Sequence, residues 1–314
     1  MREEGRIMIE HISDKDRIAG ALFGLAVGDA LGGTVEFMSR TEIAQTHGVL
    51  REIIGGGVWN LEAGETTDDT AMAIAVARGI LANPDDPLPF IAEEFVAWFR
   101  TEPKDVGNII RTTLTEGIRR GASTEEEWQI AAKIAHDANG GKSAGNGSLM
   151  RILPVALAYA RRTDREHMRS IARRQSVLTH FDPLAGECCA YYCDLIRELL
   201  LGKPLHQVLE SGVSHAPLPI NLRSPKEKLK VSGFVGDTLE TALACAYQTS
   251  SFEDALIMAV NLGGDADTIG AVAGGIVGAA YGFSHIPKRW LGKLKQRQEL
   301  HRLSLAFDKF RGRV

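Results

Sequence analysis

The sequence has little of what marks a secreted or membrane protein. Only four of its 314 residues are cysteines, and Cys188, Cys189 and Cys193 crowd one segment, where near neighbours cannot form an ordinary disulfide framework. The longest apolar run, about 269 to 283, is shorter than the roughly 18 residues that cross a bilayer. Residues 1–6 lack the apolar core of a signal peptide. We therefore expect a reduced, soluble, cytoplasmic protein without a membrane span.

The chain also lacks the features that divide a protein into domains or attract it to a charged partner. No Ser/Pro-rich linker, low-complexity tract or charge block interrupts it, so we expect one large domain. The net charge is only −4, which gives no general attraction to nucleic acid or anionic membranes. No segment shows the alternation of a β-strand, whereas apolar residues recur at helical spacing. The predicted fold class is all-α, and 44% hydrophobic residues suffice for its core.

Two clusters of short, oxygen-bearing side chains stand out in this sequence. One lies in the segment 261–268, just before the small-residue run 269–278, and the other opens the apolar run 71–77. Both stand where a helix is expected to begin, and Gly263 and Gly264 allow a tight turn beside the first. The oxygen ligands that the clusters offer are Thr67, Asp68, Asp69, Asp265, Asp267 and Thr268.

Carboxylates gathered at two helix starts predict a metal site. Four of them in one pocket repel each other strongly unless they are protonated or bridged by cations, and a pair of divalent metals is the simplest arrangement that prevents this. Because all six groups are oxygens, we expect Mg²⁺ or Mn²⁺ rather than Zn²⁺. Either cluster alone is also explained by the preference of acidic residues for helix N-termini. Their combination is far more specific.

Three further carboxylates have two explanations each. Asp29 and Glu36 flank the glycine-rich end of the first predicted helix, where a carboxylate also serves as a turn or cap residue. Asp105 precedes another predicted helix and fits an N-cap as well as a functional group. The spacing of these residues does not decide between the structural and the functional explanation.

A polar loop and a histidine are weaker candidates for a binding site. The loop 139–148 is rich in glycine and leads into a predicted apolar helix at 149–160, where backbone N–H groups would suit a phosphate. It lacks the glycine spacing and the preceding strand of a Walker loop. His180 lies between predicted helices at 164–178 and 184–201, where a histidine is structural, solvated or functional. The cysteines of the second helix fit core packing rather than metal ligation.

Several of these segments resemble, in the same order, motifs of the ADP-ribosylglycohydrolase family. The resemblance runs from Gly20 to Leu291, and several independent motifs in the family's order make chance agreement untenable. It rests on GLAVGDALG at 24–32, TVEFM at 34–38, TDDT at 67–70, KDVGN at 104–108, GNG at 145–147, TH at 179–180 and GGDADT at 263–268.

The resemblance implies a fold and a catalytic centre. The fold would be a single-domain, orthogonal bundle of helices over residues 17–314, preceded by an N-terminal extension, residues 1–16, that is longer than the family usually needs. The six oxygen ligands named above would hold two divalent cations, Mg²⁺ or Mn²⁺. Asp105 would be the catalytic carboxylate, and Glu36 would reach the metals and the ribose.

The resemblance also implies a binding site for ADP-ribose. The loop residues Asn146, Gly147 and Ser148, together with His180, would bind this group. Phe234 stands where the family has an aromatic residue that stacks on adenine. Ser148 departs from the family pattern, in which alanine stands at this position.

The implied activity is hydrolysis of the N-glycosidic bond between ADP-ribose and an arginine of a modified protein. One alternative is the same site acting on ADP-ribosyl-serine, O-acetyl-ADP-ribose or an ADP-ribosylated base. Others are a non-catalytic ADP-ribose binder, a structural relative like the family's lens crystallins, and an immunity protein that blocks a toxin by contact. The implied partners are an ADP-ribosylated protein and an ADP-ribosyltransferase, with no nucleic acid expected. The retained ligands and Asp105 favour an active enzyme, while the extension keeps the contact explanation open.

Overall fold

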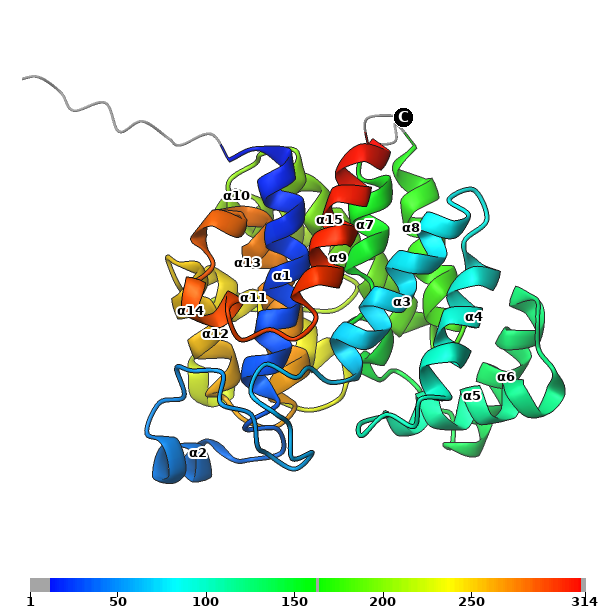
Figure 1. Ribbon diagram of the computed structural model, residues 1–314, viewed down its shortest axis with the longest axis horizontal. Helices are drawn as coiled ribbons and strands as arrows, with labels where there is room; N and C mark the ends of the chain where they lie inside the picture. The colour runs from blue at the N-terminus through cyan, green and yellow to red at the C-terminus, as the bar shows by residue number, and fades with distance from the viewer. Residues whose placement is uncertain (1–11, 162–163, 312–314) are drawn as a thin grey trace, which may run out of the picture.

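The structure is a computed structural model that describes residues 12–161 and 164–311 (Figure 1). Within these ranges the chain forms helices and no β-strand, and only two isolated β-bridges occur. The predicted all-α fold class is confirmed. Residues 1–11 of the expected N-terminal extension lie outside the described part, and the first helix begins at Asp14.

Helices of very different length make up the bundle. In chain order the α-helices are α1 (Asp14–Gly32), α2 (Arg40–His47), α3 (Asp68–Ala82), α4 (Leu88–Phe99), α5 (Asn108–Arg120), α6 (Glu125–Ala138), α7 (Leu153–Tyr159), α8 (Arg165–Val177), α9 (Pro183–Leu200), α10 (Leu205–Gly212), α11 (Val235–Tyr247), α12 (Phe252–Val260), α13 (Ala266–Tyr281), α14 (Lys288–Leu291) and α15 (Arg297–Arg311). The 3₁₀ turns are η1 (Asn146–Ser148), η2 (Val213–His215), η3 (Lys226–Lys228) and η4 (Phe283–His285). None of the described helices is long and apolar enough to cross a membrane.

Helices α1, from Gly20 onward, and α13 are buried along most of their length and touch backbone to backbone. Glycine recurs in α1 every fourth residue over 20–32, so these glycines lie on one face. A Cβ atom on Gly24 would lie 2.2 Å from the carbonyl oxygen of Gly274, and one on Gly28 would lie 1.9 Å from that of Gly270. The pairing runs in opposite directions along the two helices. The C-terminal end of α1 therefore lies beside the N-terminal end of α13.

The start of α3 joins these two helix ends through Asp29. This residue is fully buried near the end of α1, and its carboxylate accepts hydrogen bonds from the backbone N–H groups of Thr67 at 2.9 Å and Thr70 at 3.0 Å. Both threonine hydroxyls also lie within hydrogen-bonding distance of it. N–H groups at a helix start have no partner within their own helix. Asp29 supplies that partner, so the ends of α1, α3 and α13 converge.

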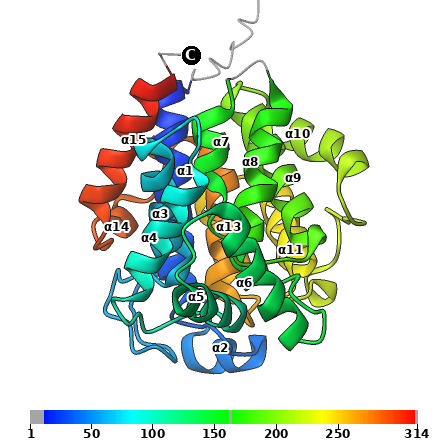
Figure 2. The same ribbon diagram turned by 90° about the vertical axis from the view of Figure 1, so that its right-hand side faces the viewer.

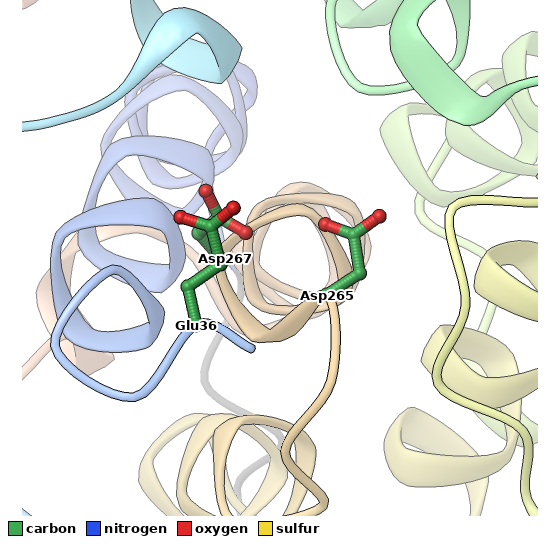
Figure 3. Close-up of side chains that lie close together, drawn as sticks. All are labelled: Glu36, Asp265 and Asp267. Carbon is green, nitrogen blue, oxygen red and sulfur yellow. The ribbon is translucent and has the colours of Figure 1, made fainter. Parts of the chain in front are cut away.

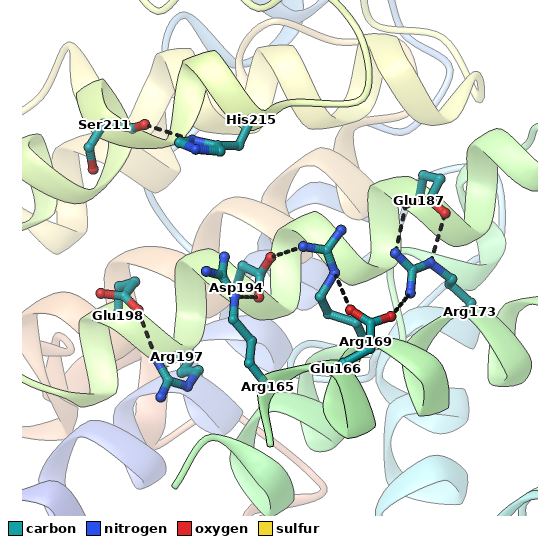
Figure 4. A network of polar contacts seen from close by, with 10 residues as sticks. All are labelled: Arg165, Glu166, Arg169, Arg173, Glu187, Asp194, Arg197, Glu198, Ser211 and His215. Carbon is teal, nitrogen blue, oxygen red and sulfur yellow. Dashed lines mark hydrogen bonds and ion pairs between the residues drawn. The ribbon is translucent and has the colours of Figure 1, made fainter. Parts of the chain in front are cut away.

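Helices α8 and α9 run side by side on another flank of the bundle (Figure 2). Ion pairs connect them (Figure 4): Asp194 of α9 lies 2.6 Å from Arg165 and 3.3 Å from Arg169 of α8. A single exposed pair contributes about 0–1 kcal/mol, but several act here on the same two helices. They hold α8 against α9, and the turn between these helices carries His180.

One helix start expected from the sequence is wrong. The helix expected at 149–160 is the shorter α7, which has Pro154 in its first turn. Proline has no N–H and is tolerated there but not in a helix interior.

The four cysteines are buried and free, with Cys245 on α11 and the others on α9. Burial raises the pKa of Cys189 to about 11 and that of Cys245 to about 12. Such thiols stay protonated and unreactive near neutral pH. All four pack in the core, as the sequence predicts for Cys188, Cys189 and Cys193.

Candidate active site

A cleft of about 350 Å³ opens where the three helix ends converge. Its walls come from the loop after α1, the starts of α3, α5 and α13, the turn η1 and the turn after α8. The predicted site residues that line it are Glu36, Asp68, Asp105, Asn146, Gly147, His180, Asp265, Asp267 and Thr268. Segments far apart in the sequence thus bring most of the predicted residues into one cleft.

Three carboxylates gather at the start of α13 (Figure 3). One oxygen from each of Glu36, Asp265 and Asp267 lies within 4.8 Å of the others. Asp265 is the N-cap residue of α13 and Asp267 lies in its first turn, whereas Glu36 follows α1. The close approach of α1 to α13 brings these carboxylates together. Oxygens at this spacing can bind a common hard cation.

Asp69 connects the two clusters predicted from the sequence. Its Oδ2 atom lies 3.3 Å from the hydroxyl oxygen of Thr67 and 3.2 Å from that of Thr268. Its Oδ1 atom is buried and has no hydrogen-bond partner among the described residues. A buried carboxylate oxygen without a partner is costly, and a metal ion would satisfy it. The donor set therefore fits a hard divalent cation.

Burial and mutual repulsion disfavour the ionised form of these carboxylates. Burial first, and then the neighbouring carboxylates, raise the pKa of Asp69 and Asp267 well above the usual range. Burial also raises the pKa of Asp68 to about 6 and that of Glu36 to about 7. A bound cation favours the ionised form of its ligands and would lower these values. Cation binding would thus relieve the repulsion inside the cluster.

Asp105 lines the cleft and is not a helix cap. Helix α5 begins at Asn108 with Gly107 as its N-cap residue, so the cap interpretation is wrong. The N–H of Gly107 donates to Asp68 Oδ2 at 3.2 Å, which holds the loop carrying Asp105 against the start of α3. Burial, and then the charges of Asp68 and Glu36, raise the pKa of Asp105 to about 9. A carboxyl group that keeps its proton near neutral pH is suited to proton transfer.

Two aromatic residues at the cleft have no counterpart in the sequence predictions. The indole N–H of Trp59 donates to a carboxylate oxygen of Glu36 at 2.5 Å. The Trp59 ring stands edge to face with that of Phe37, at 6.3 Å between ring centroids. Phe37 lines the cleft, has a positive φ of 63° and is 65% exposed. Trp59 belongs to an irregular loop, so no spacing rule could have indicated its contact with Glu36.

The loop at η1 is tied to the acidic cluster. The amide group of Asn146 donates to Asp265 Oδ2 at 2.8 Å and to the hydroxyl of Thr238 at 2.8 Å. Gly147 packs against the ring of His180, where an added Cβ atom would lie 2.9 Å from Cε1. A side chain at position 147 would therefore collide with the imidazole. The two residues form one wall of the cleft.

Some predicted site residues are placed differently. Four predicted site residues do not belong to the described lining of the cleft: Thr67, Asp69, Ser148 and Phe234. The first two lie behind the lining, as described above. The hydroxyl of Ser148 accepts hydrogen bonds from Ser176 of α8 at 2.8 Å and from Cys189 of α9 at 3.5 Å, so it faces the core between these helices. Phe234 is 41% exposed, and its backbone forms a β-bridge with Gly145 of the cleft lining.

Comparison with known proteins identifies the family. The sequence profile of the ADP-ribosylglycohydrolase family matches residues 10–313. The chain is 38% identical to ADP-ribosyl-[dinitrogen reductase] glycohydrolase from Rhodospirillum rubrum, with 90% of this chain and 92% of that protein covered. It is 33% identical to ADP-ribosylarginine hydrolase Tri1 from Serratia proteamaculans (strain 568), with 95% of this chain and 80% of that protein covered.

A solved structure agrees with this result. The chain aligns with a structure titled "ADP-ribosylglycohydrolase-related protein complex" at a TM-score of 0.79 and 35% identity. The alignment covers 95% of this chain and 99% of the other. The family profile, the sequence relatives and the fold therefore lead to the same conclusion. The chain belongs to the ADP-ribosylglycohydrolase family.

Proposed function

We propose that the protein is a metal-dependent hydrolase that removes ADP-ribose from arginine side chains of modified proteins. The observation that carries the proposal is that a buried carboxylate cluster and Asp105, with its raised pKa, share one cleft. The relatives named for ADP-ribosyl-dinitrogen reductase and for ADP-ribosylarginine support the arginine linkage. The partner is then an ADP-ribosylated protein, and an ADP-ribosyltransferase is the enzyme that would supply it.

The cofactor in this proposal is a pair of divalent cations, Mg²⁺ or Mn²⁺. The unpartnered Oδ1 atom of Asp69 and the close carboxylates around Asp267 support it. When bound, the cations would supply the positive charge that polarises substrate oxygens. The residues that would hold them are Thr67, Asp68, Asp69, Asp265, Asp267 and Thr268, with Glu36 reaching the same centre.

The reaction would break the bond between ribose C1″ and a guanidino nitrogen and join C1″ to the oxygen of water. The water loses a proton and the leaving guanidino group gains one, and Asp105 would carry this proton. Positive charge develops on the ribose ring in an oxocarbenium-like transition state. Carboxylates fixed around the cleft, Glu36 among them, would stabilise that charge without reorganising.

Binding of ADP-ribose would use the wall of the cleft that Gly147 and His180 form. Gly147 and His180 would contact it from the cleft wall, and Asn146 would hold that wall against the acidic cluster. The half-exposed ring of Phe234 would stack on adenine beside the Gly145 backbone. Ser148 would contribute through its backbone, because its side chain faces the core.

The test of the proposal is a comparison of linkages. Purified protein with Mn²⁺ is incubated with ADP-ribose attached to arginine, serine or a nucleobase, and with O-acetyl-ADP-ribose, and free ADP-ribose is measured. We expect the arginine conjugate to be cleaved fastest. Faster release from another conjugate would reassign the linkage, and release from none would contradict the enzymatic function.

A further inference from the structure

The surroundings of His180 fix which of its ring nitrogens carries the proton. The residue is only 2% exposed, and its Nδ1 atom lies 2.8 Å from the hydroxyl oxygen of Thr179. Its Nε2 atom faces the cleft wall, where a Cβ atom added to Gly145 would lie 3.3 Å away. Among the residues that the structure describes, no hydrogen bond reaches Nε2. One nitrogen is held by the protein and the other is left for a ligand.

A buried arginine determines the role of the Thr179 hydroxyl. The Nη2 atom of Arg151 donates to this oxygen at 2.8 Å. Arg151 is fully buried, donates through Nε to Gln175 at 2.8 Å and lies over the ring of Phe95 at 4.2 Å. Its position is therefore fixed by contacts on several sides. A guanidinium group can only donate, so the Thr179 oxygen is an acceptor in this bond.

The hydroxyl proton of Thr179 then has one acceptor, the Nδ1 atom of His180. If Nδ1 carried a proton instead, the hydroxyl oxygen would face two donors and its own proton would be buried without an acceptor, which is unfavourable. A charged imidazole is excluded for the same reason, because it also carries a proton on Nδ1. Burial and the nearby charge of Arg151 agree, since they lower the pKa of His180 to about 3.

We propose that Arg151 and Thr179 are positioning residues that hold His180 as the neutral tautomer protonated at Nε2, so that it donates a hydrogen bond to an oxygen of the ligand in the cleft. That the ligand is ADP-ribose rests on the proposed function; the tautomer does not. His180 would then recognise an acceptor atom by position, and would neither transfer protons nor add charge.

Nuclear magnetic resonance of the ligand-free protein tests the tautomer directly. Long-range ¹H–¹⁵N correlation spectra of protein with ¹⁵N-labelled histidine distinguish the three protonation states of each ring. His180→Gln identifies the signals of this residue among the nine histidines. We expect a neutral ring protonated at Nε2 near neutral pH. A ring protonated at Nδ1, or at both nitrogens, would overturn the proposal.

Substitutions at Thr179 test the positioning role. Thr179→Val removes the hydroxyl at nearly constant size, and we expect it to replace the single tautomer by a mixture. Thr179→Ser keeps the hydroxyl and should keep the wild-type spectrum. The matched control is Thr113→Val, which removes a buried hydrogen bond to the carbonyl oxygen of Thr179 at 3.1 Å without touching its hydroxyl. A wild-type ring spectrum in folded Thr179→Val would contradict the role of Thr179.

Titration with ADP links the tautomer to ligand binding. We expect Thr179→Val to bind ADP at least about twofold more weakly than Thr113→Val, because the apparent affinity falls with the fraction of rings still protonated at Nε2. Equal affinities would contradict the donor role. The protein could also show the Nε2-protonated ring and yet bind neither ADP nor ADP-ribose. That result would refute the proposed function but would leave the tautomer assignment unchanged.

Discussion

Asp105 is the residue on which the proposed chemistry depends most. Asp105→Asn keeps the size of the side chain and removes a carboxyl group from a crowded acidic site, so the fold and cation binding should persist. An amide cannot carry the proton, and turnover should fall by roughly 10²–10⁴-fold, the range for general acid–base catalysis. Steady-state kinetics and calorimetric titration with ADP-ribose separate turnover from binding.

The control for this substitution is a carboxylate with no link to the cleft. Asp137 forms an exposed ion pair with Lys133 at 2.6 Å, and Asp137→Asn should leave turnover unchanged. Near wild-type turnover in Asp105→Asn would remove Asp105 from the mechanism. Glu36 would then be the remaining carboxyl group for proton transfer.

Asp267 tests the metal centre at the level of one ligand. It is buried, its oxygens lie near those of Glu36 and Asp265, and Asp267→Ala removes a negative charge that bound cations need. We expect loss of Mn²⁺ binding and of activity while the helical circular dichroism spectrum is retained. Calorimetric titration with Mn²⁺ measures this, and unchanged binding at two sites would rule out Asp267 as a ligand.

Single residues were easiest to select from the sequence where several side chains of the same chemical type are neighbours in the chain. The two oxygen-rich clusters proposed to hold the metals can be located without a structure because each is contiguous, whereas Asp105 has a cap explanation that only the structure removes. The contacts of Asp29 and Trp59 could not be predicted. Asp29 accepts hydrogen bonds from residues 38 and 41 positions away, and Trp59 reaches Glu36 from an irregular loop. Such pairings depend on the tertiary fold, which one sequence does not specify.

At the scale of elements, the antiparallel pair α1 and α13 determines where the carboxylates meet. Their backbones touch along a line of glycines, and this contact sets the distance between Glu36 and the first turn of α13. Glycine spacing in α1 is visible in the sequence, but the partner helix lies far along the chain, with Gly28 facing Gly270, and could not be identified from spacing. Helix ends were also harder to predict than helices: the helix expected from residue 149 begins at Leu153, where Pro154 lies in its first turn.

Substitution of a contact glycine tests this element directly. Gly28→Ala would place a methyl group 1.9 Å from the carbonyl oxygen of Gly270, so α1 and α13 would have to separate. We expect a loss of about 1–3 kcal/mol or more in the free energy of unfolding, as for other overpacked sites, together with weaker Mn²⁺ binding. Urea denaturation and metal titration measure both effects.

A second glycine in a helix provides the control. In Gly186→Ala, the added Cβ atom would lie 3.5 Å from Arg173 Cα, an ordinary contact. Alanine favours a helix over glycine by roughly 1 kcal/mol, so this variant should be as stable as the wild type or more so. Equal stability of the two variants would show that the α1–α13 contact is not close.

At the scale of the whole molecule, the acidic cluster makes stability depend on pH and metal together. In the metal-free protein the pKa values of Glu36, about 7, and Asp105, about 9, lie above their unfolded values. The folded state therefore binds more protons than the unfolded state between about pH 4 and about pH 9, and the free energy of unfolding falls as pH rises through that window. The proposed cations would bind the deprotonated carboxylates and oppose this loss.

Thermal denaturation measures that dependence. With chelator, the melting temperature should be several degrees lower at about pH 8.5 than at about pH 6.5, since roughly 1 kcal/mol corresponds to about 2–4 °C in domains of a few hundred residues. Mn²⁺ should raise it more at the higher pH. Asp267→Ala is the control, and should show a weaker response to both pH and Mn²⁺. A metal effect that is larger at low pH would contradict the assignment of carboxylate ligands.

The most direct test of the account is the release of free ADP-ribose from ADP-ribosyl-arginine under control of the metal. Wild-type protein is measured with Mn²⁺ or Mg²⁺, then with chelator, and again after the metal is restored. We expect turnover with metal, loss of turnover with chelator and recovery on restoration. Turnover that persists in chelator, or its absence with both metals, would contradict it.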